Sequence, residues 1–204
     1  MKRVLLVAFT WLLVSCTASL PTAVRPFPDH DHWILLEDLE YHIGQSGVTL
    51  TVPAGFVTDY ASIPRGFWGI ASPHDRYSEA AVVHDYLYWT QSCTRQQADN
   101  IFLIAMKEAG VSAFRGWFIH MTVRKAGQGP WDVNAREFSA GLPRQVPKAQ
   151  TKLTATDKWS ELRVHLAEEG VYDRPTPKNL AYCVLGNSED VPKAPAILSN
   201  HAQR

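Results

Sequence analysis

The segment AAVVHDYLYW, residues 80–89, places two adjacent titratable side chains inside an apolar run. The spacing of Ala81, His84, Asp85 and Tyr88 puts all four on one face of a helix. Burial of a charged group is unfavourable unless the group is paired, binds a metal ion or takes part in a reaction. The fold must therefore place His84 and Asp85 next to a paired group, a metal ion or a substrate.

Two more helices are predicted directly after this one. Residues 94–97 (TRQQ) have the pattern of a capping box, which opens a helix that ends at Gly110. Ser112 and Gly127 delimit a third helix, whose apolar stripe we expect to lie in the core. That stripe consists of Phe114, Trp117, Phe118 and Met121. Because the connection at residues 90–93 is short, we expect the first two helices to pack antiparallel.

Strand-like patterns precede the helices. Short apolar runs between residues 33 and 57 flank a turn-forming cluster at residues 44–47 (GQSG), which predicts a β-hairpin. After residue 129, one amphipathic helix is predicted at residues 156–170, followed by a proline-rich irregular segment and a disordered tail. The chain is therefore predicted to be an α+β protein, with a small antiparallel hairpin or sheet, a three-helix core, a C-terminal helix and an irregular tail.

The N-terminus has the features of an export signal. A basic start precedes an apolar stretch of 11 residues, Val4 to Val14, and a bilayer span needs about 20. Leu13-Val14-Ser15-Cys16 resembles a bacterial lipobox, and the resemblance implies that Cys16 is acylated, palmitate included. Because Thr17 rather than Asp follows Cys16, the resemblance also implies an anchor in the outer membrane, facing the periplasm. The alternatives are the inner membrane, or a secreted protein with an ordinary signal and an incidental cysteine.

These patterns divide the chain into a signal peptide (1–15), a tether (16–32), an α+β core domain (33–128) and a C-terminal extension with one helix and a disordered tail (129–204). Lys plus Arg equals Asp plus Glu at 20 each, without a basic run, so nucleic acid is not expected as a partner. In an oxidising periplasm we expect Cys93 and Cys183 to form a disulfide, with two free thiols as the alternative.

His84 is the centre of the predicted site. In antiparallel helices, Asp99 lies early in the second helix, opposite His84 in the first. A carboxylate on one imidazole nitrogen fixes the tautomer and leaves the other nitrogen able to accept a proton from water. Within this face, Asp85 points about 100° away from His84 around the helix, so it does not orient the same ring and is predicted to offer oxygens to a hard cation such as Ca²⁺. The alternatives are a structural His84–Asp99 pair, and an Asp85 that pairs with Arg76 or Arg124.

The segment GFVTDYASIPRGFW, residues 55–68, adds two candidates. Asp59 is predicted to supply an oxygen ligand or a second carboxylate to the site of His84. Ser62 is a weaker candidate for a nucleophile, because no nucleophile-elbow glycines surround it. In the alternative, Asp59 accepts backbone N–H groups in a turn before Pro64.

The pattern HDYLYW…ADNIFLIAM resembles the active-site helix pair of secreted phospholipase A2 enzymes. The resemblance implies that His84 activates water and that Asp99 orients His84. It also implies that Asp85 ligates Ca²⁺ and that Tyr88 hydrogen-bonds the distal aspartate. The glycine-rich calcium loop and the stapling disulfides of that family have no counterpart here.

A longer part of the chain resembles an uncharacterised family of bacterial and tailed-phage proteins, a domain of unknown function. The resemblance covers residues 48–127 and rests on ordered motifs, VPAGFVTDYASIPRGFW, RYSEAAVVHDYLYW, TRQQADNIFLIAM and FRGWFIHMTVRKAG. It implies a shared architecture and no particular reaction.

Two functions of different classes fit these observations. The first is a lipid-anchored envelope hydrolase, in which His84 and Asp99 activate water against a phospholipid or another ester or amide. The second is a non-enzymatic lipoprotein, prophage-derived in one version, that binds a partner or modifies the envelope through a surface of aromatic side chains. Those side chains are Phe67, Trp68, Tyr86 and Trp89. In a third interpretation, the chain has the fold of an enzyme but no longer catalyses a reaction and serves only as a structural module.

Overall fold

The computed structural model describes residues 23–60, 77–154 and 156–195, and it confirms the α+β class. The described part of the chain contains five short strands and six α-helices. The strands are Val24–Pro26 (β1), Trp33–Leu35 (β2), Leu39–His42 (β3), Thr49–Val52 (β4) and Val57–Thr58 (β5). The first three helices are Ser78–Thr90 (α1), Arg95–Glu108 (α2) and Ala113–Ala126 (α3). The others are Gln128–Ser139 (α4), Trp159–Glu168 (α5) and Ala181–Leu185 (α6), with a 3-10 turn at Lys148–Gln150.

The strands form two antiparallel sheets. One has the order β1-β2-β5, and the other is the β3–β4 hairpin predicted around residues 44–47. The hairpin turn is closed by the backbone N–H of Ile43, which donates to the carbonyl oxygen of Val48 at 3.0 Å. Its glycines Gly44 and Gly47 have φ angles of +54° and +73°, which other residues adopt only with strain. The hairpin was therefore predictable from turn chemistry.

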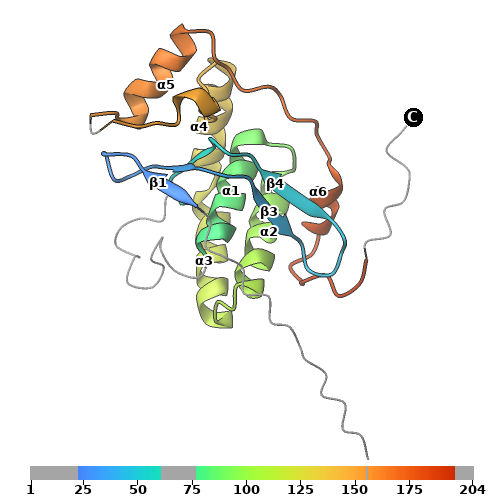
Figure 1. Ribbon diagram of the computed structural model, residues 1–204. Coiled ribbons are helices and arrows are strands. Elements are labelled where there is room, and N and C mark those ends of the chain that lie inside the picture. Colours follow the sequence, from blue (N-terminus) through green and yellow to red (C-terminus); the bar gives the residue numbers. More distant parts are fainter. Residues whose placement is uncertain (1–22, 61–76, 155, 196–204) are drawn as a thin grey trace, which may run out of the picture.

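Helices α1 and α2 form the centre of the domain, and the strands lie across them in Figure 1. The predicted capping box opens α2: the Thr94 hydroxyl accepts from the backbone N–H of Gln97, and the Gln97 side chain accepts from the N–H of Thr94. A cluster of buried side chains from β2, β4, α1 and α2 makes the main core. This packing fixes the face of α1 that carries the titratable groups. In the described ranges, no helix is long and apolar enough to cross a bilayer.

Three predictions about the surroundings of this core are wrong in part. Residues 24–26, predicted as tether, pair with β2, and Phe27 behind them is fully buried. On α3, Phe114 is 71% exposed and Trp117 is 55% exposed, so half of the predicted core stripe faces outward. Helices α4 and α6 were not predicted. In α4, Gly129 and Pro130 weaken the local helix signal, but a proline in the first turn of a helix removes no internal hydrogen bond.

The predicted helix at residues 156–170 is present as α5, with Trp159 and Leu166 buried. Its buried face packs on a second, smaller core that contains Phe27 and Ile34. Because α5 lies over the strands at one end of the molecule, the C-terminal extension contributes to the same fold as the helix pair (Figure 1).

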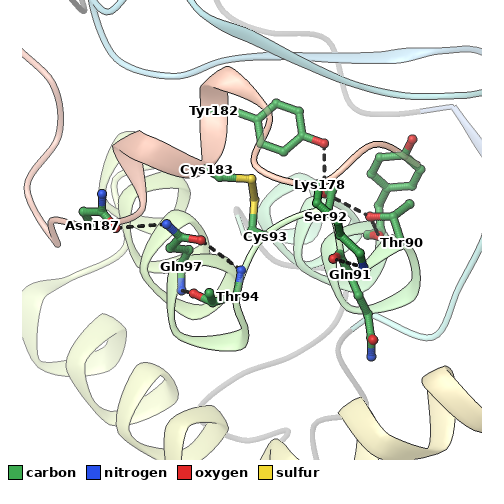
Figure 2. The surroundings of a disulfide bond; sticks show 11 residues. Thr90, Gln91, Ser92, Cys93, Thr94, Gln97, Lys178, Tyr182, Cys183 and Asn187 are labelled. Atoms are coloured by element: carbon green, nitrogen blue, oxygen red, sulfur yellow. Dashed lines mark hydrogen bonds between the residues drawn. A yellow bond between two sulfur atoms is a disulfide. The ribbon is translucent and has the colours of Figure 1, made fainter. Parts of the chain in front are cut away.

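A disulfide joins Cys93, just before α2, to Cys183 in α6 (Figure 2). Around it, the Gln97 amide donates to the Asn187 side chain, and Ser92 is hydrogen-bonded to Tyr182. Gly186 brings α6 so near the start of α2 that an added Cβ would overlap Gln97. The disulfide thus ties a segment 90 residues away to the start of the second core helix.

Replacing both cysteines by serine is expected to lower the free energy of unfolding by about 2–5 kcal/mol, because a long loop is no longer closed in the unfolded chain. Urea unfolding of the oxidised wild type and of Cys93→Ser/Cys183→Ser measures the difference. Reduced wild type serves as the control and should match the double variant. A double variant as stable as the oxidised protein contradicts this expectation.

Candidate active site

Asp99 is the buried hub of a hydrogen-bond network between α1 and α2. Its side chain accepts from three donors, and the residue is 0% exposed. Oδ1 contacts His84 Nε2 at 2.9 Å and the Tyr88 hydroxyl at 2.7 Å. Oδ2 accepts from Arg95 Nη1 at 3.0 Å. The antiparallel packing predicted from the short connection therefore brings His84 and Asp99 together.

The network sets the tautomer of His84. A carboxylate oxygen only accepts, so the hydrogen on the His84–Asp99 contact belongs to Nε2. The second nitrogen, Nδ1, is then the acceptor, and it has no hydrogen-bond partner among the described residues. Burial and the charge of Asp99 raise the pKa of the Tyr88 hydroxyl, which keeps that group a donor. The arrangement has the form of an oriented imidazole with one open basic nitrogen.

Asp85 lies beside this network but has different partners. It accepts a hydrogen bond from the Thr58 hydroxyl, and its Oδ2 also accepts from the backbone N–H of Asp59 at 3.2 Å. Burial and the charge of Asp85 raise the pKa of Tyr60 to about 12. Arg124, one alternative partner for Asp85, pairs with Glu189 instead. These two hydrogen bonds hold the end of β5 against α1.

A cavity of about 710 Å³ lies over these groups. His84, Asp85, Tyr88 and Asp59 line it on one side. Its apolar lining comes mainly from α3 and α4, and comprises Phe118, Ile119, Val123, Ala126, Pro130 and Val133. Although His84 is only 3% exposed, it faces a space that is large enough for a small ligand.

Arg144 closes the β5 side of this cavity. Its guanidinium lies 3.5 Å from the carboxylate of Asp59 and donates to the carbonyl oxygen of Val57 and the side chain of Asn134. The interpretation of Asp59 as a metal ligand thus competes with a cation that already contacts it. Within residues 23–60, 77–154 and 156–195, no group of three or more His, Cys, Asp or Glu side chains is placed to hold a metal ion. Ca²⁺ binding remains a prediction.

Gly127, between α3 and α4, packs directly on the network. A Cβ added there would overlap the Tyr88 hydroxyl oxygen and the carbonyl oxygen of Val123. Gly127→Ala is therefore expected to push Tyr88 away from Asp99 and to lower the free energy of unfolding by about 1–3 kcal/mol. Thermal or urea unfolding checks this. Gly129→Ala is the matched control, because its Cβ would meet no atom within 4 Å. Equal stability of the two variants would show that Tyr88 is not held as described.

Several predicted residues either are not described by the structure or are not part of this network. Cys16, Ser62, Phe67, Trp68 and Arg76 fall outside the described residues. Trp89, proposed for an aromatic binding surface, is buried, and its indole N–H donates to Asp173 at 2.7 Å. Tyr86 is half-buried against Phe56.

Sequence reasoning missed Arg95, Thr58, Gly127 and Arg144. The spacing of Arg95 and Asp99, one helical turn apart, was a signal for the first. The other three reach the site through tertiary packing, which leaves no periodic signal in the sequence.

Residues 33–123 match a protein family described as "Protein of unknown function (DUF1353)". The matched range contains Asp59, His84, Asp85, Tyr88 and Asp99, and it excludes Arg144. The chain is also similar to "Uncharacterized protein y4jT" of Sinorhizobium fredii (strain NBRC 101917 / NGR234), at 33% identity over 84 residues. The aligned part is 40% of this chain and 25% of the relative, so the chain spans about a quarter of that protein's length. No solved structure matches the chain.

Proposed function

We propose that this protein is a hydrolase of the cell envelope, in which His84 acts as the general base. The observation that carries the proposal is the contact of His84 Nε2 with the buried Asp99 at 2.9 Å, while the imidazole lines a 710 Å³ cavity. A buried, oriented histidine next to a ligand-sized space is the arrangement that general-base catalysis requires.

In the proposed reaction, Nδ1 of His84 takes a proton from water as the water oxygen attacks the carbonyl carbon of an ester or amide. Asp99 accepts a hydrogen bond from Nε2–H and stabilises the imidazolium that forms. The bond to the leaving alcohol or amine then breaks, and His84 returns the proton to it. Atoms and charge balance without a further reactant. Asp99 and Tyr88 act as positioning residues, because they touch His84 or its partner rather than the reacting atoms.

The location proposed for the enzyme is the outer membrane, anchored through Cys16 and facing the periplasm. The Cys93–Cys183 disulfide supports an oxidising compartment, because such bonds rarely persist in the cytosol. An enzyme on a lipid anchor meets membrane esters at high local concentration, so phospholipid belongs among the first substrates to test.

The test is hydrolysis by the purified full chain of a fluorogenic phospholipid, a short-chain fluorogenic ester and a fluorogenic amide. Each substrate is tested with Ca²⁺ and with EDTA, because the prediction of Ca²⁺ at Asp85 requires loss of activity in EDTA. Turnover of any of the three above that of heat-denatured protein is expected. Absence of turnover of all three in both conditions contradicts the proposal.

A second candidate function is non-enzymatic binding. Phe114 and Trp117 on α3 are exposed, and their ring centroids lie 6.2 Å apart. This aromatic pair favours a binding function over a purely structural module. In that case His84 and Asp99 serve only to hold α1 against α2.

A further inference from the structure

Arg163 of α5 also lines the cavity, at the end formed by α4 and α5. Its guanidinium lies over the rings of Trp89 and Trp159, at 5.7 and 5.3 Å from their centroids. Nη1 donates to Glu137 at 2.7 Å, and Nε donates to the carbonyl oxygen of Pro143. Packing on two aromatic faces and two hydrogen bonds hold the group in one orientation.

The remaining nitrogen of this group, Nη2, is buried and has no hydrogen-bond partner in the described part of the chain. A buried donor without an acceptor is unfavourable, and such groups in folded proteins are few. Here the group belongs to a side chain that lines a cavity with apolar walls. Because Nη2 has almost no accessible surface, a ligand that brings an acceptor into this cavity completes the hydrogen bonding of Arg163 through a small shift of the guanidinium toward it.

The charges at this end indicate what kind of acceptor fits. Arg163 is paired with Glu137, and Arg144 contacts Asp59. The charge of Arg163 also acts on the nearby Asp173. Each arginine thus has a carboxylate beside it, so no surplus positive charge remains there to offset a phosphate or a carboxylate. An uncharged oxygen, such as the carbonyl of an ester or amide, takes the hydrogen bond without an added charge.

We propose that Arg163 binds the carbonyl oxygen of an uncharged acyl ligand, whose chain lies along the apolar wall of α3 and α4. The proposal names a substrate class for the hydrolase and rests on that function for the reaction, but not for binding. The proposal also explains how the product leaves. Hydrolysis turns the uncharged ester into a carboxylate, which the negative charges of Glu137 and Asp59 repel.

The test uses three probes that the protein cannot hydrolyse: 2-undecanone, methyl decyl ether and decanoate. They share an apolar chain and differ in the head, which is a carbonyl, an ether oxygen or a carboxylate. Isothermal titration calorimetry measures their binding to the full chain. For the wild type we expect the ketone to bind at least about threefold more tightly than the ether, because a carbonyl oxygen is a stronger hydrogen-bond acceptor than an ether oxygen, and more tightly than decanoate.

Arg163→Met keeps an unbranched side chain between the two tryptophans but removes every donor, so the preference for the ketone should disappear. Arg163→Lys keeps the charge and lacks a second nitrogen, and it should lose the preference as well, which covers the case in which the methionine variant does not fold. Arg136→Met, at an exposed arginine of α4, is the control and should keep it.

Equal binding of ketone and ether by the wild type, no binding of any probe, tighter binding of decanoate, or a full preference retained by Arg163→Lys would each overturn the proposal. Because none of these probes is turned over, the result is independent of His84. Preserved ketone binding without hydrolysis of any substrate would contradict the proposed reaction alone.

Discussion

Replacing Asp99 by alanine is expected to lower the free energy of unfolding by about 2–5 kcal/mol, because two buried donors each lose their acceptor. The carboxylate is completely buried and accepts from His84, Tyr88 and Arg95. Alanine leaves the buried imidazole and the buried hydroxyl without their acceptor, whereas Arg95, at the margin, can turn to water. The loss should therefore exceed that of an ordinary buried hydrogen bond.

Urea unfolding of wild type and Asp99→Ala measures this effect. Asp132→Ala is the matched control, because Asp132 is an exposed aspartate with a hydrogen bond to Gln128, and its loss should change stability by less than about 0.5 kcal/mol. Asp99→Asn keeps the volume and one acceptor oxygen, and it should fall between the two if the alanine variant does not fold. An Asp99→Ala protein as stable as the Asp132 control would mean that the network does not hold the helices.

The helix pair could be predicted because its signals are local. The capping box at Thr94, the short connection before it and the placement of His84 and Asp99 depend only on nearby residues. From these, the contact of the two side chains follows without knowledge of the rest of the fold. The same holds for the β3–β4 hairpin, whose glycines specify the turn.

The wall of the cavity could not be predicted in this way. Residues 128–139 were not predicted as a helix, because glycine and proline at their start weaken the local signal. They nevertheless form α4, which packs against α1. Arg144 comes from a segment with no periodic signal, and Arg163 comes from the helix predicted at residues 156–170. Both reach the cavity from sequence positions beyond the range matched by the family. A sequence pattern indicates which face of a helix is polar, but it does not say which distant side chains close the space above that face.

The exposed aromatic stripe on α3 was mispredicted for a related reason. Apolar residues at helical spacing mark one face of a helix, and that face is usually buried. On α3 the stripe is split: Phe118 faces the cavity, while Phe114 and Trp117 stay on the surface. The helical spacing of these apolar residues was predicted correctly. Which of them face the core depends on the rotation of the helix about its axis, and its contacts with α2 and α4 set that rotation.

Stability measurements alone do not separate a catalytic His84–Asp99 pair from a structural one, since both lose stability when Asp99 is removed. The rate of hydrolysis separates them. A general base contributes about 10²–10⁴-fold to the rate, whereas a structural histidine contributes nothing once the protein is folded.

The most direct test is therefore the rate at which His84→Gln hydrolyses the best substrate of the wild type, with folding checked by circular dichroism. His165→Gln, at an exposed histidine of α5, is the control. The account predicts a rate lower by about 10²–10⁴-fold for His84→Gln and an unchanged rate for the control. A folded His84→Gln protein that hydrolyses the substrate at the wild-type rate would contradict the account.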